Sequence, residues 1–329
     1  MRALICGISG QDGAYLSRFL LAKGYDVWGT SRDAQMASFE RLERLGIRSS
    51  VTLRSMAPND FRSVFTVLND CAPEVYFLAG QSSVVGLSFE QPAETLESIC
   101  IGTLNLMEAI RLIRRPIRLY HASSSECFGE MSEQPANEAT PFAPRSPYAV
   151  AKASAHWLVA NYREAYGLFA CNGILFNHES PLRPRRFVTR KIVSAACQIA
   201  KGASTRLELG RLDIVRDWGW APEYVEAMWR MLQCEHPRDY VIATGEANTL
   251  EAFVEAVFGA VNLDWRQYVD IVPSLLRPTD LTWSQGDPGR AQRELLWRPR
   301  LRMRDVAREM VKFELEYLNG SSTAVPRGD

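Results

Sequence analysis

A glycine-spaced loop directly follows the first apolar segment of the chain and limits what the chain can fold into. Residues Ala3–Cys6 form a strand candidate, and Gly7, Gly10 and Gly13 follow it at intervals of three residues. In a strand–loop–helix unit the first glycine permits a tight turn, the second lets the backbone approach a pyrophosphate, and the third allows close helix packing. The N-terminus of the next helix then faces the phosphates. The loop therefore predicts a dinucleotide-binding site.

Strand and helix candidates alternate through the first half of the chain. The strand candidates are Ala3–Cys6, Asp26–Thr30, Val51–Arg54, Glu74–Leu78, Ile117–Ala122 and Phe169–Leu175. The helix candidates are Gln11–Lys23, Ala34–Leu45, Asp60–Asn69, Ala93–Leu112 and Tyr148–Tyr166. Because parallel strands are joined by helical crossovers, this alternation predicts an α/β fold with a Rossmann-type doubly wound parallel sheet.

The pattern changes after Phe176. Residues Asn177–Arg190 are rich in Pro and Arg and are predicted to be irregular. Helix candidates follow near Thr189–Lys201, Trp220–Leu232 and Leu250–Val261, with a strand-like piece at Tyr240–Ala243. We expect a dinucleotide-binding domain over residues 1–176 with returning segments near 212–245, a smaller mixed α/β substrate-binding lobe mainly over 177–318, and a disordered tail over 319–329.

Charge and cysteine usage narrow the class of protein. The 38 basic and 38 acidic residues cancel, which argues against nucleic-acid or membrane-surface partners and leaves any anionic ligand to a local cluster. The seven cysteines include no Cys-x-x-Cys pair and the four histidines show no metal-ligand spacing, so we expect reduced thiols and no metal. The N-terminus enters a strand directly, and no apolar run reaches transmembrane length. Together these features predict a cytoplasmic protein.

A tyrosine–lysine pair and the serine run before it predict redox chemistry on an alcohol. Tyr148 and Lys152 are four residues apart, so on a helix they share one face, and a nearby ammonium favours the tyrosinate by lowering the pKa of the phenol. Such a tyrosine can exchange a proton with a substrate hydroxyl. The hydroxyl of Ser124, within the run Ser123–Glu126, would complete a site that interconverts an alcohol and a ketone.

The carboxylate at the end of the serine run adds a second base. Simple oxidation of an alcohol has no use for Glu126. A carboxylate beside a redox set indicates that oxidation is followed by removal of a more distant proton from carbon. That sequence of steps is the chemistry of a dehydratase with an internal redox cycle.

The end of the second strand candidate bears on the choice of cofactor. Ser31 and Arg32 stand where an acidic residue would bind the ribose 2′-hydroxyl of NAD, and a guanidinium suits a 2′-phosphate. NADP is therefore predicted. Asp33 follows directly and would favour NAD if it held that position, and the alternative for Arg32 is a solvated residue at the start of a helix.

With these residues in place, the chain resembles the extended short-chain dehydrogenase/reductase superfamily and, within it, the GDP-mannose 4,6-dehydratase family, from Gly7 to about Arg300. The resemblance is carried by the motifs Gly7–Tyr15, Leu78–Ser82, Ser123–Glu126, Pro144–Lys152, Gly173–Pro181, Phe187–Lys191, Arg216–Gly219 and Arg277–Pro278. It implies a hydro-lyase that converts GDP-D-mannose to GDP-4-keto-6-deoxy-D-mannose and water. NADP would carry a hydride from C4 to C6 and be regenerated in each cycle.

The resemblance also implies roles for residues at matching positions. Tyr148 would accept the 4-hydroxyl proton, Lys152 would hold the nicotinamide ribose, and Glu126 would remove the C5 proton, with Ser124 or protonated Glu126 donating a proton to the departing C6 hydroxyl. The implied cofactor contacts are Gly7, Gly10, Gln11, Asp12, Gly13, Ser31, Arg32, Met56, Leu78, Ala79, Gln81, Ser82, Lys152, His178 and Arg183. The implied substrate contacts are Ser83, Asn177, Lys191, Arg216, Arg277 and Asp280.

Departures from the family pattern and rival activities leave alternatives open. Ser124 replaces the usual threonine and keeps its hydroxyl, whereas the usual paired arginines after the second strand are absent and Asp280 replaces a glutamate. Another GDP-sugar, such as a GDP-heptose, is therefore an alternative substrate. A dTDP-glucose dehydratase would typically carry Asp-Glu in place of Ser125-Glu126. A nucleotide-sugar 4-epimerase or reductase needs the Ser/Tyr/Lys set without Glu126, and a non-catalytic NADP-binding protein would not need the set.

The resemblance finally implies an assembly. The matching dimer is built from two helices of each subunit, which correspond here to Ala93–Leu112 and Tyr148–Tyr166. We expect a homodimer held by a four-helix bundle with two-fold symmetry, or a dimer of such dimers.

Overall fold

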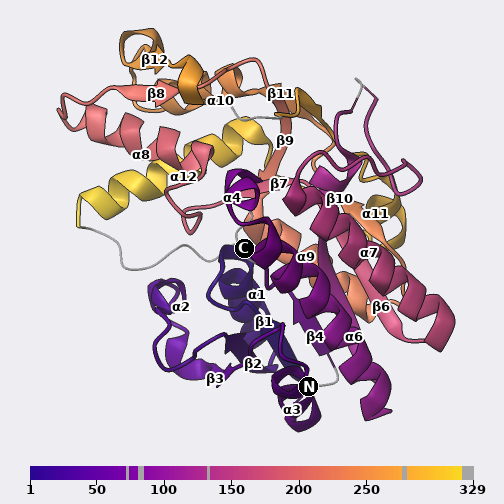
Figure 1. The fold of residues 1–329 in the computed structure, drawn as a ribbon. Coiled ribbons are helices and arrows are strands. Elements are labelled where there is room, and N and C mark those ends of the chain that lie inside the picture. The colour runs from indigo at the N-terminus through magenta and orange to yellow at the C-terminus, as the bar shows by residue number, and fades with distance from the viewer. Residues whose placement is uncertain (72–73, 81–84, 132–133, 276–279, 321–329) are drawn as a thin grey trace.

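The computed structural model describes residues 1–71, 74–80, 85–131, 134–275 and 280–320, and its centre is a seven-stranded sheet (Figure 1). The strands lie in the order β10 (Tyr240–Ile242), β6 (Phe169–Leu175), β5 (Arg118–Ser124), β4 (Glu74–Phe77), β1 (Arg2–Cys6), β2 (Asp26–Ser31) and β3 (Thr52–Ser55). Every neighbouring pair is parallel. The order reverses between β1 and β4, where doubly wound folds bind ligands beyond the carboxyl ends of the strands. The predicted Rossmann-type sheet is confirmed.

Helices cover both faces of this sheet. One face packs against α1 (Gln11–Ala22) and α9 (Ala221–Gln233). The other face packs against α3 (Phe61–Asp70), α6 (Gly102–Ile113) and α7 (Pro147–Tyr166). The shorter helices of this half are α2 (Glu40–Arg44), α4 (Val85–Glu90) and α5 (Pro92–Leu96).

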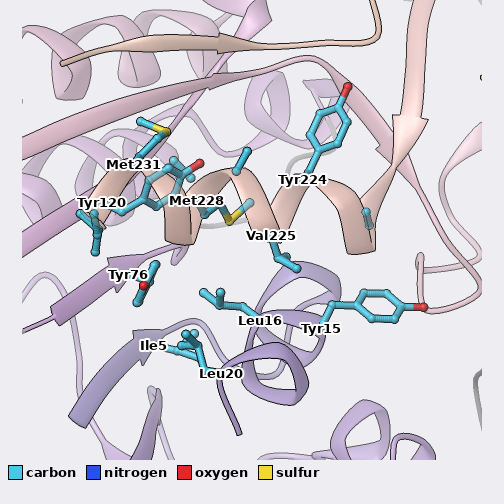
Figure 2. Packing of buried hydrophobic residues seen from close by; sticks show 14 of the residues in the cluster. Ile5, Tyr15, Leu16, Leu20, Tyr76, Tyr120, Tyr224, Val225, Met228 and Met231 are labelled. Carbon is cyan, nitrogen blue, oxygen red and sulfur yellow. The ribbon is translucent and has the colours of Figure 1, made fainter. Parts of the chain in front are cut away.

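Alternating side chains of the strands supply two apolar layers. Leu4 belongs to the layer beneath α3 and α6, whereas its neighbour Ile5 belongs to the layer beneath α1 and α9, because successive strand side chains point to opposite faces. Figure 2 shows Ile5 and Leu16 below the helix that carries Val225 and Met228. Full burial of a side chain of this size contributes about 1.5–3 kcal/mol. The layers thus fix β1, and with it the start of the glycine loop.

The C-terminal half adds a smaller body with its own core. Helices α8 (Val188–Ala200), α10 (Leu250–Gly259) and α12 (Met303–Leu318) share one apolar cluster that includes Trp218. Two small sheets accompany them, β12 (Val269–Ile271) with β8 (Leu207–Leu209), and β9 (Val215–Trp220) with β7 (Asn177–Glu179), β11 (Ala247–Thr249) and β13 (Trp283–Ser284). Helix α11 (Gly289–Glu294) packs beside β10. The division of the chain at residues 176 and 177, like the disorder expected for 319–329, stays a prediction.

Three local expectations differ from the structure. Only Glu40–Arg44 of the expected helix Ala34–Leu45 is helical. The Asp33 carboxylate accepts bonds of 2.9 and 3.1 Å from the N–H groups of Gln35 and Met36 and caps one turn, which is not continued beyond Ala37. Within Asn177–Arg190, expected to be irregular, β7 pairs with β9. The expected helix Ala93–Leu112 contains a π-helical segment at Glu97–Ile101.

The described part of the chain contains neither a membrane-spanning helix nor a cluster of metal ligands. None of its helices combines the length and the apolarity that crossing a bilayer requires. Nor do its His, Cys, Asp and Glu side chains come together in a group of three or more that could hold a metal ion.

Candidate active site

A cleft of about 580 Å³ lies at the carboxyl ends of the central strands and gathers most of the predicted site residues. The predicted residues that line it are Gly7, Gly10, Gln11, Asp12, Gly13, Ser31, Arg32, Met56, Leu78, Ala79, Ser124, Glu126, Tyr148, Lys152, Asn177, His178 and Arg183. They come from loops that follow different strands. The sheet therefore brings together residues that are up to about half the chain apart in sequence.

Other predicted residues lie elsewhere. Lys191, Arg216 and Asp280 are not among the residues that line the cleft. The Arg216 guanidinium donates to the carbonyl oxygens of Val215 and Leu281, and Lys191 Nζ donates to a carbonyl oxygen of β8. The predictions for Gln81, Ser82, Ser83 and Arg277 fall outside the described residues.

The glycine loop has the geometry of a phosphate-binding turn. Gly7 has a φ of 92°, and a Cβ there would lie 3.0 Å from the backbone nitrogen of Ala79. A Cβ on Gly13 would lie 2.5 Å from the carbonyl oxygen of Gly7. Gly10 precedes α1 as its N-cap and supplies no side-chain bond to the first amides of the helix. These amides remain available to an anion, so the loop fits the pyrophosphate of a dinucleotide.

A buried ion pair links the glycine loop to β7. The Nδ1 of His178 contacts the carbonyl oxygen of Phe176 at 2.7 Å, and Nε2 lies 3.0 Å from Asp12 Oδ2. Both partners only accept hydrogen bonds, so both ring nitrogens donate and the imidazole is charged. Burial opposes charge on both side chains, yet their mutual attraction prevails: the pKa of His178 is raised, and that of Asp12 is lowered to about 2. A fixed ion pair, in which the two charges offset each other, therefore lies within the predicted dinucleotide site.

The start of α7 places the tyrosine and the lysine. Ser146 is the N-cap, and its Oγ accepts a 3.1 Å bond from the Ala149 N–H, while Pro147 occupies the first turn, where its missing N–H costs nothing. Tyr148 and Lys152 then follow on one helix face with side chains that are nearly buried. Lys152 Nζ donates a 2.7 Å bond to the carbonyl oxygen of Ala122 at the end of β5.

The acid–base properties of this pair differ from the sequence-based expectation. Burial raises the pKa of the Tyr148 phenol above its ordinary value, although a hydrogen bond with the Ser124 hydroxyl opposes the change. Burial also lowers the pKa of Lys152 to about 8. The sequence predicted that Lys152 lowers the pKa of Tyr148. In the protein alone, desolvation of the phenol has the larger effect.

Glu126 stands on a tight turn at the end of β5. Residues Ser125–Phe128 form a 3₁₀ turn, and the backbone N–H of Glu126 donates to Ser124 Oγ over 3.3 Å. The turn ends at Gly129, where φ is 71°. The Glu126 side chain is half-buried and lines the same cleft as Ser124 and Tyr148. A hydroxyl, a phenol, an ammonium and a carboxylate thus share one cleft.

The structure adds cleft residues that no sequence motif indicated. Arg41 from α2 donates 2.8 Å bonds to the carbonyl oxygens of Ser9 and Leu182, and it lines the cleft beside the glycine loop. Glu94 from α5 also lines the cleft and lies 3.4 Å from the exposed guanidinium of Arg32. Neither residue has a local signal in the sequence, because each reaches the cleft only through the packing of distant segments.

The fold and the site define the class of protein. A parallel Rossmann-type sheet, a phosphate-binding glycine loop and a Ser/Tyr/Lys set are the features of nucleotide-sugar epimerases and dehydratases, which work with a bound nicotinamide dinucleotide. Within this class the chain belongs to the GDP-mannose 4,6-dehydratase family, because the family model described as GDP-mannose 4,6 dehydratase matches residues 4–310. The resemblance predicted from the motifs is confirmed.

Relatives and solved structures agree with this assignment. GDP-mannose 4,6 dehydratase 2 of Arabidopsis thaliana is 45% identical over 99% of this chain and 90% of its own length. GDP-mannose 4,6-dehydratase of Sinorhizobium fredii is 44% identical over 97% of this chain and 98% of its own length.

Among solved structures, UDP-glucose 4-epimerase of Thermus thermophilus, in complex with NAD, aligns with a TM-score of 0.82 and 27% identity over 95% of this chain and 99% of its own. The dTDP-glucose 4,6-dehydratase DesIV of Streptomyces venezuelae aligns with a TM-score of 0.86 and 21% identity over 97% and 98% of the two chains, and shows the shared fold. RMD of Pseudomonas aeruginosa, complexed with NADPH, aligns with a TM-score of 0.78 and 22% identity over 96% and 98%.

Proposed function

We propose that this chain dehydrates GDP-D-mannose to GDP-4-keto-6-deoxy-D-mannose. The observation that carries the proposal is the position of Glu126, a carboxylate in the same cleft as Ser124, Tyr148 and Lys152. An enzyme that only oxidised or reduced an alcohol would need no base on this turn. The family assignment supplies the substrate class, a GDP-sugar.

Each side chain of the set has a separate task in this reaction. A nicotinamide bound in the cleft would supply the redox chemistry as the acceptor and then the donor of a hydride. Tyr148 exchanges the proton of the 4-hydroxyl, and Ser124 orients the phenol through its hydrogen bond. Glu126 takes the C5 proton, which a ketone at C4 acidifies, and gives a proton to the departing C6 hydroxyl. C5 takes up a proton when the hydride returns to C6, and this balances the proton that Tyr148 removed from the 4-hydroxyl. Lys152, which lines the cleft, would hold the nicotinamide ribose.

We infer that the dinucleotide is NADP. The Arg32 side chain is exposed at the cleft and can turn toward a 2′-phosphate. The competing carboxylate, Asp33, is engaged by the turn that follows it and does not line the cleft. The nearby Glu94 pairs with Arg32 in the protein alone, and this pair would open to admit a phosphate.

The direct test is to incubate the purified protein with GDP-mannose and catalytic NADP⁺ and to follow the mass of the sugar nucleotide. We expect the loss of one water without net formation of NADPH, and faster turnover of protein reconstituted with NADP⁺ than with NAD⁺. No reaction despite clear binding of NADP(H) would contradict GDP-mannose as substrate. GDP-heptoses and 4-keto sugars would then test the remaining alternatives, another dehydratase and a reductase.

We also propose a homodimer through α6 and α7. These helices pack against each other, and with the preceding π-helical segment they expose a set of large apolar side chains. We define this α6–α7 face by Ile101, Leu112, Val150 and Trp157, which are between 41% and 60% exposed. Large apolar side chains exposed on neighbouring helices are typical of surfaces that a partner covers. Two copies related by two-fold symmetry would bury them in a four-helix bundle.

The variant Leu112→Glu should weaken this dimer at least about tenfold, because each subunit would have to bury a carboxylate in an apolar interface. Light scattering after size exclusion should show the mass falling from dimer to monomer on dilution. Ile271→Glu is the control, since Ile271 is 51% exposed on β12, away from the α6–α7 face. An unchanged mass for Leu112→Glu would rule out this interface.

The seven cysteines are all unpaired, which supports a reducing, cytoplasmic location.

A further inference from the structure

Successive turns of α7 reach consecutive residues at the carboxyl end of β5. Tyr148 forms a hydrogen bond with the Ser124 hydroxyl. Lys152 donates to the carbonyl oxygen of Ala122. One turn further, Nδ1 of His156 lies 3.2 Å from Ser123 Oγ. The three helix residues are spaced by four, so they share one face of α7. The mechanism proposed above gives roles to Tyr148 and Lys152 but none to His156.

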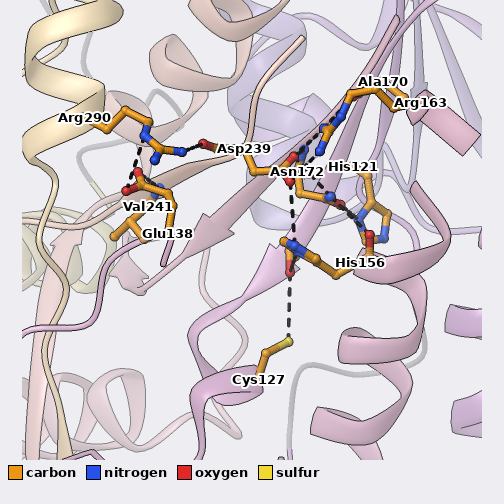
Figure 3. Close-up of polar contacts among 11 residues, drawn as sticks. His121, Cys127, Glu138, His156, Arg163, Ala170, Asn172, Asp239, Val241 and Arg290 are labelled. Carbon is orange, nitrogen blue, oxygen red and sulfur yellow. Dashed lines mark hydrogen bonds and ion pairs between the residues drawn. The ribbon is translucent and has the colours of Figure 1, made fainter. Parts of the chain in front are cut away.

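A carboxylate holds the far side of the imidazole. Nε2 of His156 lies 3.7 Å from Asp239 Oδ2. Figure 3 marks this ion pair with a dashed line between the two side chains. Asp239 is itself fixed, since Arg163 donates two bonds of 2.7 and 2.8 Å to it and the backbone N–H of Asn172 donates a third of 2.7 Å. The ring edge also packs against Phe142, with centroids 4.8 Å apart. His156 therefore has one orientation between β5 and Asp239.

This orientation assigns the ring proton. A carboxylate can only accept, so the Coulomb attraction of Asp239 across 3.7 Å favours the neutral ring with its N–H at Nε2, although this separation is longer than a hydrogen bond. Nδ1 is then left as the acceptor for the Ser123 O–H. Burial lowers the pKa of His156 even though Asp239 opposes the change, which agrees with a neutral ring. A second cavity of about 310 Å³ borders His156 and Asp239 on the side away from Ser123.

Ser123 connects the imidazole to the turn that carries Glu126. Its Oγ lies 3.9 Å from Sγ of Cys127, the residue that directly follows Glu126. Ser123 and Cys127 are buried, with 3% and 0% of their surfaces exposed. The two flank Ser124 and Glu126 in sequence, so a hydroxyl held between imidazole and thiol fixes the backbone on both sides of the reacting groups.

We propose that His156 is a positioning residue for the dehydration, acting through Ser123 to fix the end of β5 and the Ser125–Phe128 turn. The identity of the reaction rests on the proposed function, whereas the hydrogen bond between His156 and Ser123 does not depend on it. Without the Nδ1 acceptor the Ser123 hydroxyl is released, and the turn can shift by a fraction of an ångström relative to Tyr148. Such a shift would displace Ser124 and Glu126, which act on the reacting carbons. We therefore expect removal of the hydrogen bond to lower kcat and to leave KM nearly unchanged.

The hydrogen bond is tested without substrate. Nitrogen NMR of protein labelled at its four histidines reports the protonated atom of each ring. The variant His156→Phe keeps an aromatic ring against Phe142, removes one set of signals and thereby assigns it. We expect a neutral ring with its proton on Nε2 near neutral pH, and a shift of the Nδ1 signal in Ser123→Ala. A proton on Nδ1, or an imidazolium, would overturn the proposal.

The positioning role is tested by a double-mutant cycle on the enzyme loaded with NADP. Ser123→Ala and His156→Phe should each lower kcat about tenfold, as expected for one lost hydrogen bond that also displaces reacting groups, and leave KM within about twofold. The double variant should be no slower than the slower single variant, because both changes remove the same bond. Effects that multiply, or a loss confined to KM, would refute the role.

A matched control separates this role from general damage to the second cavity. Arg238→Ala changes an exposed side chain in the wall of the same cavity and should retain the parent kcat. Ser123→Ala is a small change that tests the proposal even if His156→Phe fails to fold. A parent protein that does not turn over GDP-mannose would contradict the proposed function. The NMR measurement of which His156 nitrogen carries the proton would then be the test of the hydrogen bond to Ser123.

Discussion

The variant Tyr148→Phe is expected to dehydrate GDP-mannose about 10²- to 10⁴-fold more slowly than the parent protein, the usual contribution of one general acid–base group. The phenol is the cleft group that exchanges a proton with the 4-hydroxyl, and the hydrogen bond from Ser124 orients it for this task. The benzyl ring of phenylalanine can keep the packing of Tyr148 against Val85 and Ile99. The loss should therefore be chemical rather than structural.

The measurement is kcat from the mass of the product, with thermal melting and NADP binding to verify the fold. Tyr162→Phe is the matched control on the same helix. The hydroxyl of Tyr162 donates to Glu108, and neither residue lines the cleft, so this variant should keep the parent kcat. A Tyr148→Phe variant with a near-parent rate would remove the tyrosine from the mechanism.

The elements of the fold were predictable where a local pattern is sufficient. The strand–glycine–helix unit over residues 2–22 specifies its turn sterically, since a Cβ on Gly13 would lie 2.5 Å from the carbonyl oxygen of Gly7. Helix α7 was predicted over Tyr148–Tyr166 and begins one residue earlier, because Pro147 occupies its first turn after the Ser146 N-cap. The helix expected over Ala34–Leu45 was wrong at its start, where the single turn capped by Asp33 is not continued beyond Ala37 and α2 begins only at Glu40.

The residues of the site divide in a similar way. Tyr148 and Lys152 could be placed together from their spacing alone, because a helix fixes the relation between positions four apart. The Asp12–His178 pair joins residues 166 positions apart, and only the resemblance pointed to both. The raised pKa of Tyr148 was not predictable, since desolvation depends on how tertiary packing surrounds the phenol. The sequence places His156 one helical turn beyond Lys152, on the same face of α7. Its proximity to Asp239, 83 positions later in the chain, is visible only in the structure.

The variant Glu126→Gln should block dehydration while oxidation at C4 continues. A carboxamide accepts hydrogen bonds but is far too weak a base to take a proton from carbon, so the reaction should stop at the 4-keto hexose. The backbone N–H at this position donates to Ser124 Oγ, and this bond does not depend on the carboxylate, so the turn should persist. We expect turnover to fall on the order of 10²–10⁴-fold, with reduced nicotinamide accumulating in a single turnover with GDP-mannose.

Absorbance of reduced nicotinamide, recorded beside the mass of the sugar nucleotide, separates the possible roles of Glu126. Accumulation without loss of water assigns the C5 proton to Glu126, and Glu126→Asp, which keeps a carboxylate set back by one methylene, should recover part of the turnover. Normal loss of water from the Gln variant would assign the elimination to another base. Loss of the absorbance signal as well would make Glu126 part of the oxidation itself. In that case the cleft would lack a separate base for elimination, and the same Ser/Tyr/Lys set would instead support a nucleotide-sugar epimerase or reductase, which is why this variant is the decisive one for the proposed function.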